Sequence, residues 1–348
     1  MPILNDRDEI SRIDSSNMKE LLETFDEQCI GARQIKIPLP SKTDYSSLCI
    51  VGMGGSAIAG DFIRGLIRTE CRVPCIVHRD YGLPSFIREG SLVVALSYSG
   101  NTEETLSACR EAVYRKADLW TLSSGGALET FAKKEGAPYV RIPSGNPPRC
   151  SVGWLFFPLF SLFQRLGYID AFCDTDFDDF VKAKIRECAP DVIEKNPAKI
   201  LARDCFNRNI LIYSGRLLAP AALRWKTQIA ENSKAFAGCN EFPEMNHNEI
   251  MAWRYPEFLV ANSAALFLYD PADHPRVSLR MELTETILKK KGVLVRRIGP
   301  FSGDLRTRLF LAAVLGDWLS FYLALLNDVD PTEISEITFL KEELSKKE

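Results

Sequence analysis

The sequence predicts an α/β fold in which two tandem domains each hold a mostly parallel sheet flanked by helices. Short apolar runs of strand length recur along the chain, and segments of helical length separate most of them. Two of these runs lead into turns rich in glycine or hydroxyl side chains, as parallel strands do where a helix follows. The order of strand, glycine turn and helix returns in the second half, so we expect one domain at 1–170 and another at 171–348.

The first half is interpreted as a βαβ series behind a helical arm at 16–25. Strands are expected near 48–51, 75–78, 92–96, 119–122 and 139–142, and helices near 57–68, 103–115 and 126–134. This alternation predicts a parallel sheet of the Rossmann-like, flavodoxin type with helices on both faces. The proline-rich loop 143–149 ends the series, and helical segments follow at 152–166 and 177–188.

The second half repeats this outline. A strand at 210–213 leads into the turn 214–216 (Ser-Gly-Arg) and a helix over 217–230. The remaining elements are strands near 258–261, 264–269 and 293–297, a helix near 277–290, a long apolar helix at 304–326 and a polar tail helix at 333–346. The turn 214–216 has neither the triple glycine of 52–56 nor the Ser-x-Ser-Gly-x-Thr pattern of 97–102, so we expect one anion site in the chain rather than two.

Composition places the chain among ordinary globular proteins, with 46% hydrophobic and 26% charged residues. A formal net charge of −3 gives no general attraction to nucleic acid or to an anionic membrane. The N-terminus lacks the basic start and apolar core of a secretory signal. The longest apolar stretches, such as 154–163, are interpreted as too short or too interrupted to span a membrane. We therefore expect a cytoplasmic protein with neither nucleic acid nor membrane as a partner.

The ten cysteines are scattered, mostly inside apolar runs, as reduced core residues are. Cys71, Cys75 and His78 could be interpreted as three metal ligands. A strand through Cys75 would point alternate side chains apart, however, and no fourth ligand is evident. We expect no metal at this place.

The turn at 97–102, Ser-Tyr-Ser-Gly-Asn-Thr, directly follows an apolar strand and precedes an acidic helix start. Free backbone N–H groups and the helix dipole favour negative charge there, and the hydroxyls of Ser97, Ser99 and Thr102 add donors. The turn has no lysine and no Walker pattern. It therefore suits a compact phosphate monoester better than a nucleoside triphosphate with its metal.

A glycine-rich turn at 52–56, Gly-Met-Gly-Gly-Ser, follows the first strand. Such glycines allow positive φ and a close approach of the backbone to a ligand, although a tight turn with nothing bound has the same composition. The spacing Gly52-x-Gly54-x-x-Ala57, with Asp80 after the next strand, also fits a dinucleotide fingerprint and keeps an NAD-dependent dehydrogenase as an alternative. The turn at 97–102 favours phosphate, since a dinucleotide site does not need a second hydroxyl-lined cradle on a neighbouring strand.

These two turns resemble the signature turns of the SIS (sugar isomerase) domain. A third block, 231–234 (Glu-Asn-Ser-Lys) followed by 244–249 (Glu-Met-Asn-His-Asn-Glu), resembles the bifunctional phosphoglucose/phosphomannose isomerase family. The resemblance extends from about residue 45 to the C-terminal helix. It implies tandem SIS domains, a homodimer, no metal or organic cofactor, and interconversion of glucose 6-phosphate and mannose 6-phosphate with fructose 6-phosphate.

Aldose–ketose isomerisation needs a base that moves a proton between C1 and C2, a group that opens the sugar ring, and donors that stabilise the enediolate. From the residues alone, Glu231 could be a solvated helix glutamate and His247 a structural neighbour of a helix cap. The resemblance implies that Glu231 is the base and that His247, supplied by the neighbouring subunit, opens the ring. It also implies that Arg149 stabilises the enediolate and that Lys341 assists ring opening. Without it, Arg149 would be a surface arginine and Lys341 one of several tail lysines.

Binding residues follow from the same resemblance. The phosphate is expected against Ser56, Ser97, Ser99 and Thr102, with Gly54 and Gly55 providing backbone. Thr332, in Asp330-Pro331-Thr332, resembles a threonine that lets this family accept both C2 epimers, although Glu333 stands where a second proline is common. A non-catalytic sugar-phosphate sensor is the other alternative. It is weakened because the first forty residues are too short and too acidic for a DNA-binding module.

Overall fold

The computed structural model describes residues 2–68, 71–170 and 176–346, which form two compact units. The N-terminal unit comprises Thr24–Lys182 and Ser302–Phe310. The C-terminal unit comprises Met1–Glu23, Ala183–Phe301 and Leu311–Glu348. The two units are therefore not the same as the predicted domains 1–170 and 171–348, because the first segment of the chain belongs to the C-terminal unit.

The N-terminal unit is built on a five-stranded parallel sheet of order β2-β1-β3-β4-β5. Its elements are α3 (Phe25–Arg33), β1 (Ser47–Val51), α4 (Gly54–Ile67), β2 (Cys75–His78), β3 (Ser91–Leu96), α5 (Glu103–Tyr114), β4 (Asp118–Ser123), α6 (Gly126–Glu135), β5 (Tyr139–Arg141), η2 (Pro148–Cys150) and α7 (Val152–Arg165). This is the flavodoxin-like strand order, so the predicted fold class is confirmed.

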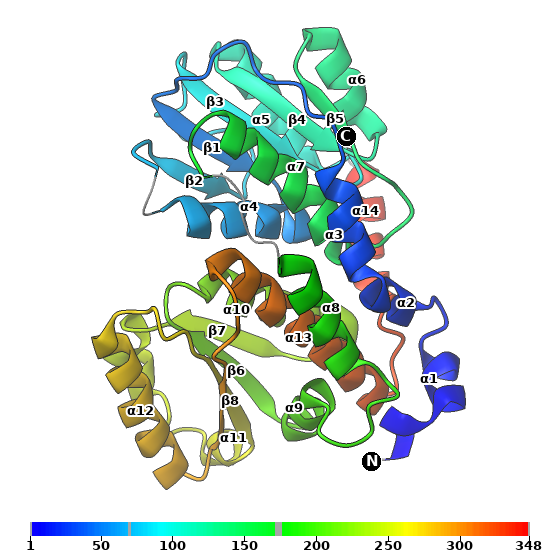
Figure 1. The fold of residues 1–348 in the computed structure, drawn as a ribbon, viewed down its shortest axis with the longest axis vertical. Coiled ribbons are helices and arrows are strands. Elements are labelled where there is room, and N and C mark those ends of the chain that lie inside the picture. Colours follow the sequence, from blue (N-terminus) through cyan, green and yellow to red (C-terminus); the bar gives the residue numbers. More distant parts are fainter. Residues whose placement is uncertain (1, 69–70, 171–175, 347–348) are drawn as a thin grey trace. The chain divides into compact units, whose positions relative to one another are not determined.

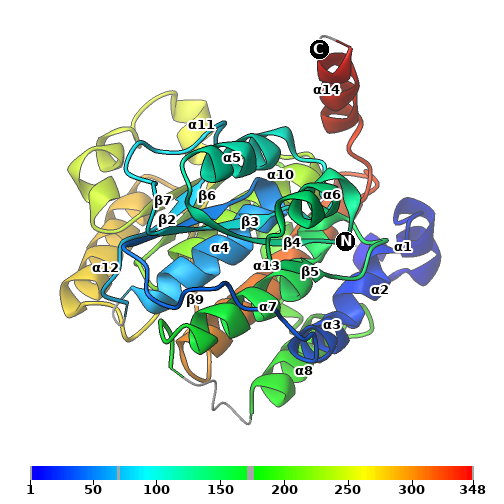
Figure 2. The ribbon, with the colours of Figure 1, turned by 90° about the horizontal axis from the view of Figure 1, so that it is seen from above.

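Both faces of this sheet are covered, which explains why its central strands are continuous apolar runs. Every residue of β1 and β3 is buried. Figure 2 shows α5 and α6 on one side of the strands and α4 and α7 on the other. Gly60 allows α4 to approach the sheet, because a Cβ at this position would lie 2.8 Å from Ile50 Cγ2.

The C-terminal unit repeats this sheet without the fifth strand, in the parallel order β7-β6-β8-β9. Its elements, seen in Figure 1, are η1 (Pro2–Asn5), α1 (Arg7–Ile13), α2 (Met18–Glu23), α9 (Pro197–Cys205), β6 (Asn209–Ser214), α10 (Ala219–Ser233), β7 (Ala237–Glu241), η3 (Glu244–His247), η4 (Glu249–Met251), α11 (Glu257–Ala261), β8 (Ser263–Leu268), α12 (Pro275–Lys290), β9 (Leu294–Ile298) and α14 (Ser335–Ser345). Two further helices, α8 (Phe177–Cys188) and α13 (Leu305–Leu326), contribute residues to both units.

Two predicted elements need correction, and other elements were missed. The strand predicted at 258–261 is the short helix α11, and the missing strand is β7, whose half-exposed sequence Ala-Gly-Cys-Asn-Glu has no apolar run. The single arm helix predicted at 16–25 is two helices, α2 and α3, which meet at Thr24 and belong to different units. Helix α9 was not predicted.

Helix α13 is long and apolar enough to cross a membrane, so the expectation that every apolar stretch is too short or too interrupted is wrong by these criteria. Its most apolar window of 18 residues is, however, entirely buried within the protein. Complete burial of this kind is typical of a helix in a protein core.

Candidate active site

The predicted phosphate turns meet at one point of the N-terminal sheet. Strands β1 and β3 are neighbours, yet the chain leaves β1 toward β2 on one side and leaves β3 toward β4 on the other. Ligands of open α/β sheets bind at such a switch point, beyond the carboxyl ends of the two strands. The turn after β1 begins α4 at Gly54, and the turn after β3 begins α5 at Glu103.

Hydrogen bonds within the turn after β3 fix its hydroxyl groups. Ser97 Oγ and Thr102 Oγ1 share a hydrogen bond of 2.8 Å, and Ser97 Oγ also accepts from Gly100 N at 3.0 Å. Ser99, which is exposed, accepts from Asn101 N at 3.2 Å. Gly100 has φ of +74°, and a Cβ at this position would overlap the carbonyl of Gly125. The turn therefore requires glycine at position 100 for two separate reasons.

The turn after β1 lies against the loop that carries Arg149. Gly54 is exposed with φ of +49°, and a Cβ at Gly55 would lie 2.8 Å from Pro148 O and 3.1 Å from Arg149 Cα. Arg149 is only 3% exposed. A side chain at Gly55 would therefore push the Arg149 loop away from the start of α4.

Tyr98 connects these segments. Its amide donates to Ser56 Oγ at 3.1 Å, its hydroxyl accepts from Asn146 N at 3.0 Å, and its carbonyl accepts from Ser124 Oγ at 2.7 Å. One buried tyrosine thus joins the turn after β3 to the first turn of α4 and to the loop before Arg149. Seven predicted residues lie in or next to the segments that it joins: Gly54, Gly55, Ser56, Ser97, Ser99, Thr102 and Arg149.

The predicted base lies in the C-terminal unit. Glu231 is half-buried in the last turn of α10. This helix is fastened to α13 by Arg224, whose guanidinium makes two hydrogen bonds of 2.9 and 2.7 Å to the carboxylate of Asp317. Gln228 adds a third bond to Asp317 at 2.9 Å, and Asn232 donates to Ser320 Oγ at 2.9 Å. These contacts follow one face of α10, with a spacing of four residues, so they fix the helix that carries Glu231.

The predicted ring-opening residue, His247, is an exposed side chain in a firmly held segment. Met245 before it is completely buried, and Asn246 Nδ2 donates to Thr284 Oγ1 at 2.9 Å. Glu249 after it accepts hydrogen bonds from the hydroxyl of Tyr213 and from Asn240 Nδ2. Burial raises the pKa of Tyr213, and the bond to Glu249 raises it further, so the tyrosine remains a neutral donor.

The remaining two predicted residues also lie in this unit. Thr332 is half-buried in the loop before α14, and its amide donates to Asp330 Oδ1 at 2.7 Å. Lys341 is exposed on α14. The predicted residues are thus divided between the two units, and the C-terminal unit carries Glu231, His247, Thr332 and Lys341.

The switch point of the C-terminal unit is different, because an internal carboxylate lies there. Asp273, in the loop after β8, accepts from Leu217 N at 3.3 Å in the turn after β6. A Cβ at Gly215 would overlap the Asp273 carboxylate. An anion of the protein itself therefore lies beside the start of α10, where the dipole of a helix favours negative charge.

Sequence reasoning missed Tyr98 and Glu249, which hold segments that carry predicted site residues, and Asp273, which lies at the switch point of the C-terminal unit. Tyr98 and Glu249 lie inside motifs that were recognised, so proximity to a motif was a usable signal. The role of Asp273 had no local signal.

Two other predicted features have ordinary partners in the structure. Cys71 Sγ contacts Val73 O at 3.3 Å, and His78 Nε2 contacts Gly82 O at 3.1 Å. Among the described residues, no group of three His, Cys, Asp or Glu side chains could hold a metal ion. Asp80, the acidic residue of the dinucleotide alternative, accepts from the amide of Tyr81 at 2.7 Å.

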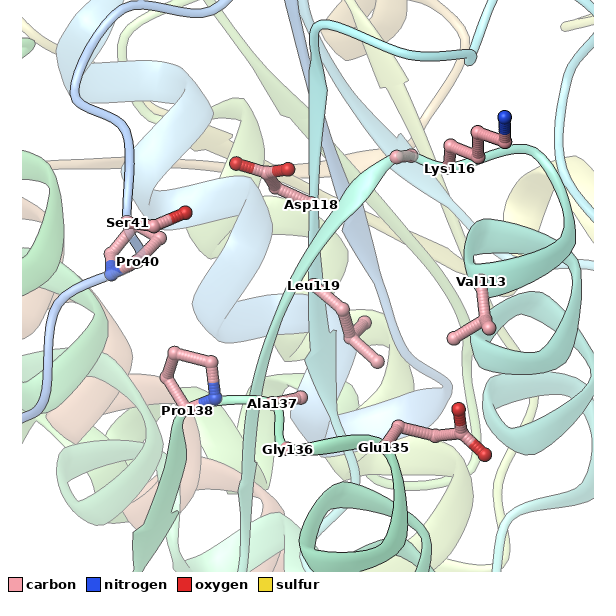
Figure 3. A pocket seen from close by; sticks show the side chains of 11 residues that line it. Pro40, Ser41, Val113, Lys116, Asp118, Leu119, Glu135, Gly136, Ala137 and Pro138 are labelled. Atoms are coloured by element: carbon pink, nitrogen blue, oxygen red, sulfur yellow. The ribbon is translucent and has the colours of Figure 1, made fainter.

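A cavity of about 280 Å³ lies elsewhere in the N-terminal unit. Figure 3 shows Lys116, Asp118 and Glu135 around it. Asp118 begins β4, and Pro138 directly precedes β5, so the cavity lies at the amino ends of these strands. The predicted phosphate turns lie at the other ends of the strands, the carboxyl ends.

Comparison with known proteins identifies relatives over most of the chain. A family model described as "Bacterial phospho-glucose isomerase C-terminal SIS domain" matches residues 194–344. The bifunctional phosphoglucose/phosphomannose isomerase of Caldicellulosiruptor bescii is 40% identical over 87% of this chain and 91% of its own. The enzyme of the same name from Aquifex aeolicus is 37% identical over 87% and 92% of the two chains. In fold, a glucose-6-phosphate isomerase-like protein from Thermus thermophilus matches with a TM-score of 0.64 at 18% identity, covering 95% of this chain and 98% of its own.

Proposed function

Because the chain belongs to the bifunctional phosphoglucose/phosphomannose isomerase family, we propose that it interconverts glucose 6-phosphate and mannose 6-phosphate with fructose 6-phosphate. It is an isomerase, and the resemblance carried by its three motifs is confirmed. The dehydrogenase alternative loses its support. The family model covers the C-terminal domain of the tandem SIS pair, and we assign the N-terminal unit as the other SIS domain.

One observation carries the proposal for substrate binding, namely the convergence of seven predicted residues at the β1/β3 switch point. The phosphate lies against Ser56, Ser97, Ser99 and Thr102. The amides at the start of α4 and the positive end of its dipole add to the attraction. Binding here needs no metal, because hydroxyl and amide donors already match a compact phosphate monoester.

Chemistry in this proposal is a proton transfer. Glu231 takes the proton from one of the two carbons C1 and C2 and returns it to the other through a cis-enediolate. Arg149 offers a fixed cation to the enediolate oxygens, and its burial reduces the screening of its charge by water. The transferred proton comes from the substrate, so the reaction requires no organic cofactor.

Ring opening requires a second group, and we assign it to His247 of the neighbouring subunit, assisted by Lys341. The exposed apolar side chains near His247 support an interface with a second subunit. Met251 is 62% exposed, Tyr255 77% and Phe258 72%, which is unusual for three large apolar side chains in one short segment. A homodimer would cover them and carry His247 to its partner.

A cytoplasmic location fits the chemistry of the cysteines. All nine cysteines in the described part of the chain are free thiols. Burial raises the pKa of Cys49 and of Cys205 to about 12, so these thiols stay protonated and unreactive. Buried free thiols of this kind are typical of reducing compartments.

The first test is a coupled assay on the chelator-treated full chain with fructose 6-phosphate, following both aldose products. Glu231→Gln should lower turnover by about 10²- to 10⁴-fold while fructose 6-phosphate still binds. Glu282→Gln, which changes an exposed glutamate on α12, is the matched control and should retain full activity.

Other outcomes would change the assignment. Glucose 6-phosphate as the only product would retain the mechanism and remove the activity on mannose 6-phosphate. Tight binding of fructose 6-phosphate without turnover in the unaltered protein would favour the sensor.

A further inference from the structure

The residue that closes α10 is a lysine in a backbone conformation that favours glycine. Lys234 has φ of 53° and ψ of 35°. Glycine is the usual residue where a helix ends in this left-handed conformation, and a side chain there costs about 1–2 kcal/mol. The hydrogen bonds that the Lys234 side chain makes offset part of this cost.

The side chain of Lys234 reaches the loop that follows α13. Its Nζ donates to Asp330 O at 2.6 Å and to Asn232 O at 3.3 Å. The neighbouring Ser233 adds a second connection, because its carbonyl accepts from Asn327 Nδ2 at 2.9 Å. Two hydrogen bonds thus fasten the loop at 327–330 to the last turn of α10.

The fastened segment leads directly to Thr332. Asp330 Oδ1 accepts from Thr332 N at 2.7 Å, and Asp330 Oδ2 accepts from the hydroxyl of Ser15. Pro331 between them is buried. A displacement of Asp330 would therefore be passed on to Thr332 two residues later.

The charge of Lys234 also acts on the start of α14. The carboxylate of Glu336 accepts hydrogen bonds from the amide of Glu336 and from the side chain of Ser335, and both lower its pKa. The nearby ammonium of Lys234 lowers the pKa of Glu336 further. Glu336 thus remains a carboxylate at the N-terminal end of α14, where the helix dipole favours negative charge. One ammonium group therefore contacts the end of α10 and the loop before Thr332, and its charge helps to keep Glu336 ionised.

We infer that Lys234 is a positioning residue that holds the loop carrying Thr332 against the helix carrying Glu231, and thereby sets the balance between the two C2 epimers. The inference rests on the proposed function, in which Glu231 moves the proton, and on the acceptance of both C2 epimers that the family resemblance implies for Thr332. Displacement by about 1 Å at a reacting centre is enough to change a rate 10²-fold, so a loop that shifts should affect the two products unequally.

The test is the product ratio of Lys234→Gly with fructose 6-phosphate as substrate. Glycine relieves the left-handed backbone and keeps the end of the helix, so the variant should unfold within a few degrees of the unaltered protein. We expect mannose 6-phosphate formation to fall about 5- to 10-fold, with glucose 6-phosphate formation within about twofold. Lys234→Arg, which can still donate to Asp330 O, should restore the original ratio.

The controls separate this inference from the proposed function. Lys226→Ala removes an exposed lysine from the same helix and should leave the ratio unchanged. An unchanged ratio in Lys234→Gly would overturn the inference, and so would an equal fall of both products, because that would place the effect on Glu231 alone. Lys234→Arg behaving like Lys234→Gly would also overturn it. Failure of the proposed function would already be seen in the unaltered protein, as the absence of turnover.

Discussion

The two sheets share one strand order and differ in what lies at their switch points. In the N-terminal unit, the turns after β1 and β3 present serine and threonine hydroxyls and the first amides of α4. In the C-terminal unit, the turns after β6 and β8 are joined by the carboxylate of Asp273, which accepts from Leu217 N. Under the proposed function, the same backbone frame binds the substrate phosphate in one unit and holds a carboxylate of the protein in the other. Two switch points of the same strand order can therefore differ in the anion that lies there.

The second difference is how each unit fixes the helix after its first strand. In the N-terminal unit, the backbone of the Arg149 loop packs against the start of α4, where Gly55 leaves no room for a side chain. The C-terminal unit holds α10 by side chains, with Arg224 and Asp317 only 1% and 4% exposed. This internal ion pair holds the middle of α10, and the proposed base Glu231 lies in the last turn of the same helix.

Substituting the glycine of each turn should break this comparison with the largest effect. Gly100→Ala places a Cβ into the Gly125 carbonyl and forces a left-handed residue, so we expect a loss of about 3 kcal/mol or more in the free energy of unfolding. The Michaelis constant for fructose 6-phosphate should rise about tenfold or more, a cost of about 1.4 kcal/mol in binding. Denaturant titration and initial-rate kinetics measure the two effects.

Gly215→Ala is the matched variant in the C-terminal unit. Its Cβ displaces the Asp273 carboxylate rather than a backbone carbonyl, so we expect a loss of about 1–3 kcal/mol with an unchanged Michaelis constant. A rise in the Michaelis constant equal to that of Gly100→Ala would contradict the assignment of phosphate binding to the N-terminal turns alone.

Removing the Asp273 carboxylate tests the same comparison, with a smaller expected effect on stability than Gly100→Ala. Asp273→Ala deletes a carboxylate that is 8% exposed beside the start of α10, and should cost about 1–2 kcal/mol of stability. Added sulfate should restore part of this loss in the variant beyond its effect on the unaltered protein, in thermal unfolding at fixed ionic strength. Equal stabilisation of both proteins by sulfate would show that Asp273 does not occupy an anion site.

A pH experiment gives the smallest expected effect. Burial, together with the nearby charge of Arg203, lowers the pKa of Lys199, on α9 of the C-terminal unit, from 10.5 to about 8. Between these two values the unfolded chain binds more protons than the folded protein, so stability should rise with pH in this window and be lowest below pH 8. We expect a change on the order of 1 kcal/mol between pH 8 and 10, absent in Lys199→Met. Denaturant midpoints at both pH values measure it, and an equal pH dependence in the variant would assign the effect to other groups.

The sequence predicted those parts of the molecule whose causes are local. Strands β1 and β3 were found because every residue in them is buried and most are apolar. The predicted phosphate turns were recognised because positive φ and closely spaced hydroxyl groups require particular residues within a few positions. Strand β7 was missed because its half-exposed residues carry no apolar pattern, and α11 was taken for a strand because Phe258-Leu259-Val260 has the composition of one.

The contacts that support the site could not be predicted in the same way. Lys234 and Asp330 are 96 residues apart, and Arg224 and Asp317 are 93 residues apart. The sequence does not show which residue each of them contacts, because a lysine, arginine or aspartate is usually a surface residue. Only the fold brings the two partners of each pair together. The roles of Glu231 and His247 came from family resemblance and stay predictions until they are tested.

The interleaved division of the chain has a consequence for synthesis. The first segment, up to Glu23, is made before any of the strands it accompanies, and its partners include Asp328, which accepts from Arg12 at 2.7 Å. A ribosome adding about 5–20 residues per second needs at least about 15 seconds between these two positions. The N-terminal unit likewise lacks residues 302–310 until late. Neither unit is complete until the last part of the chain has been made. Two fragments obtained by dividing the chain near residue 170 would therefore each have an incomplete core.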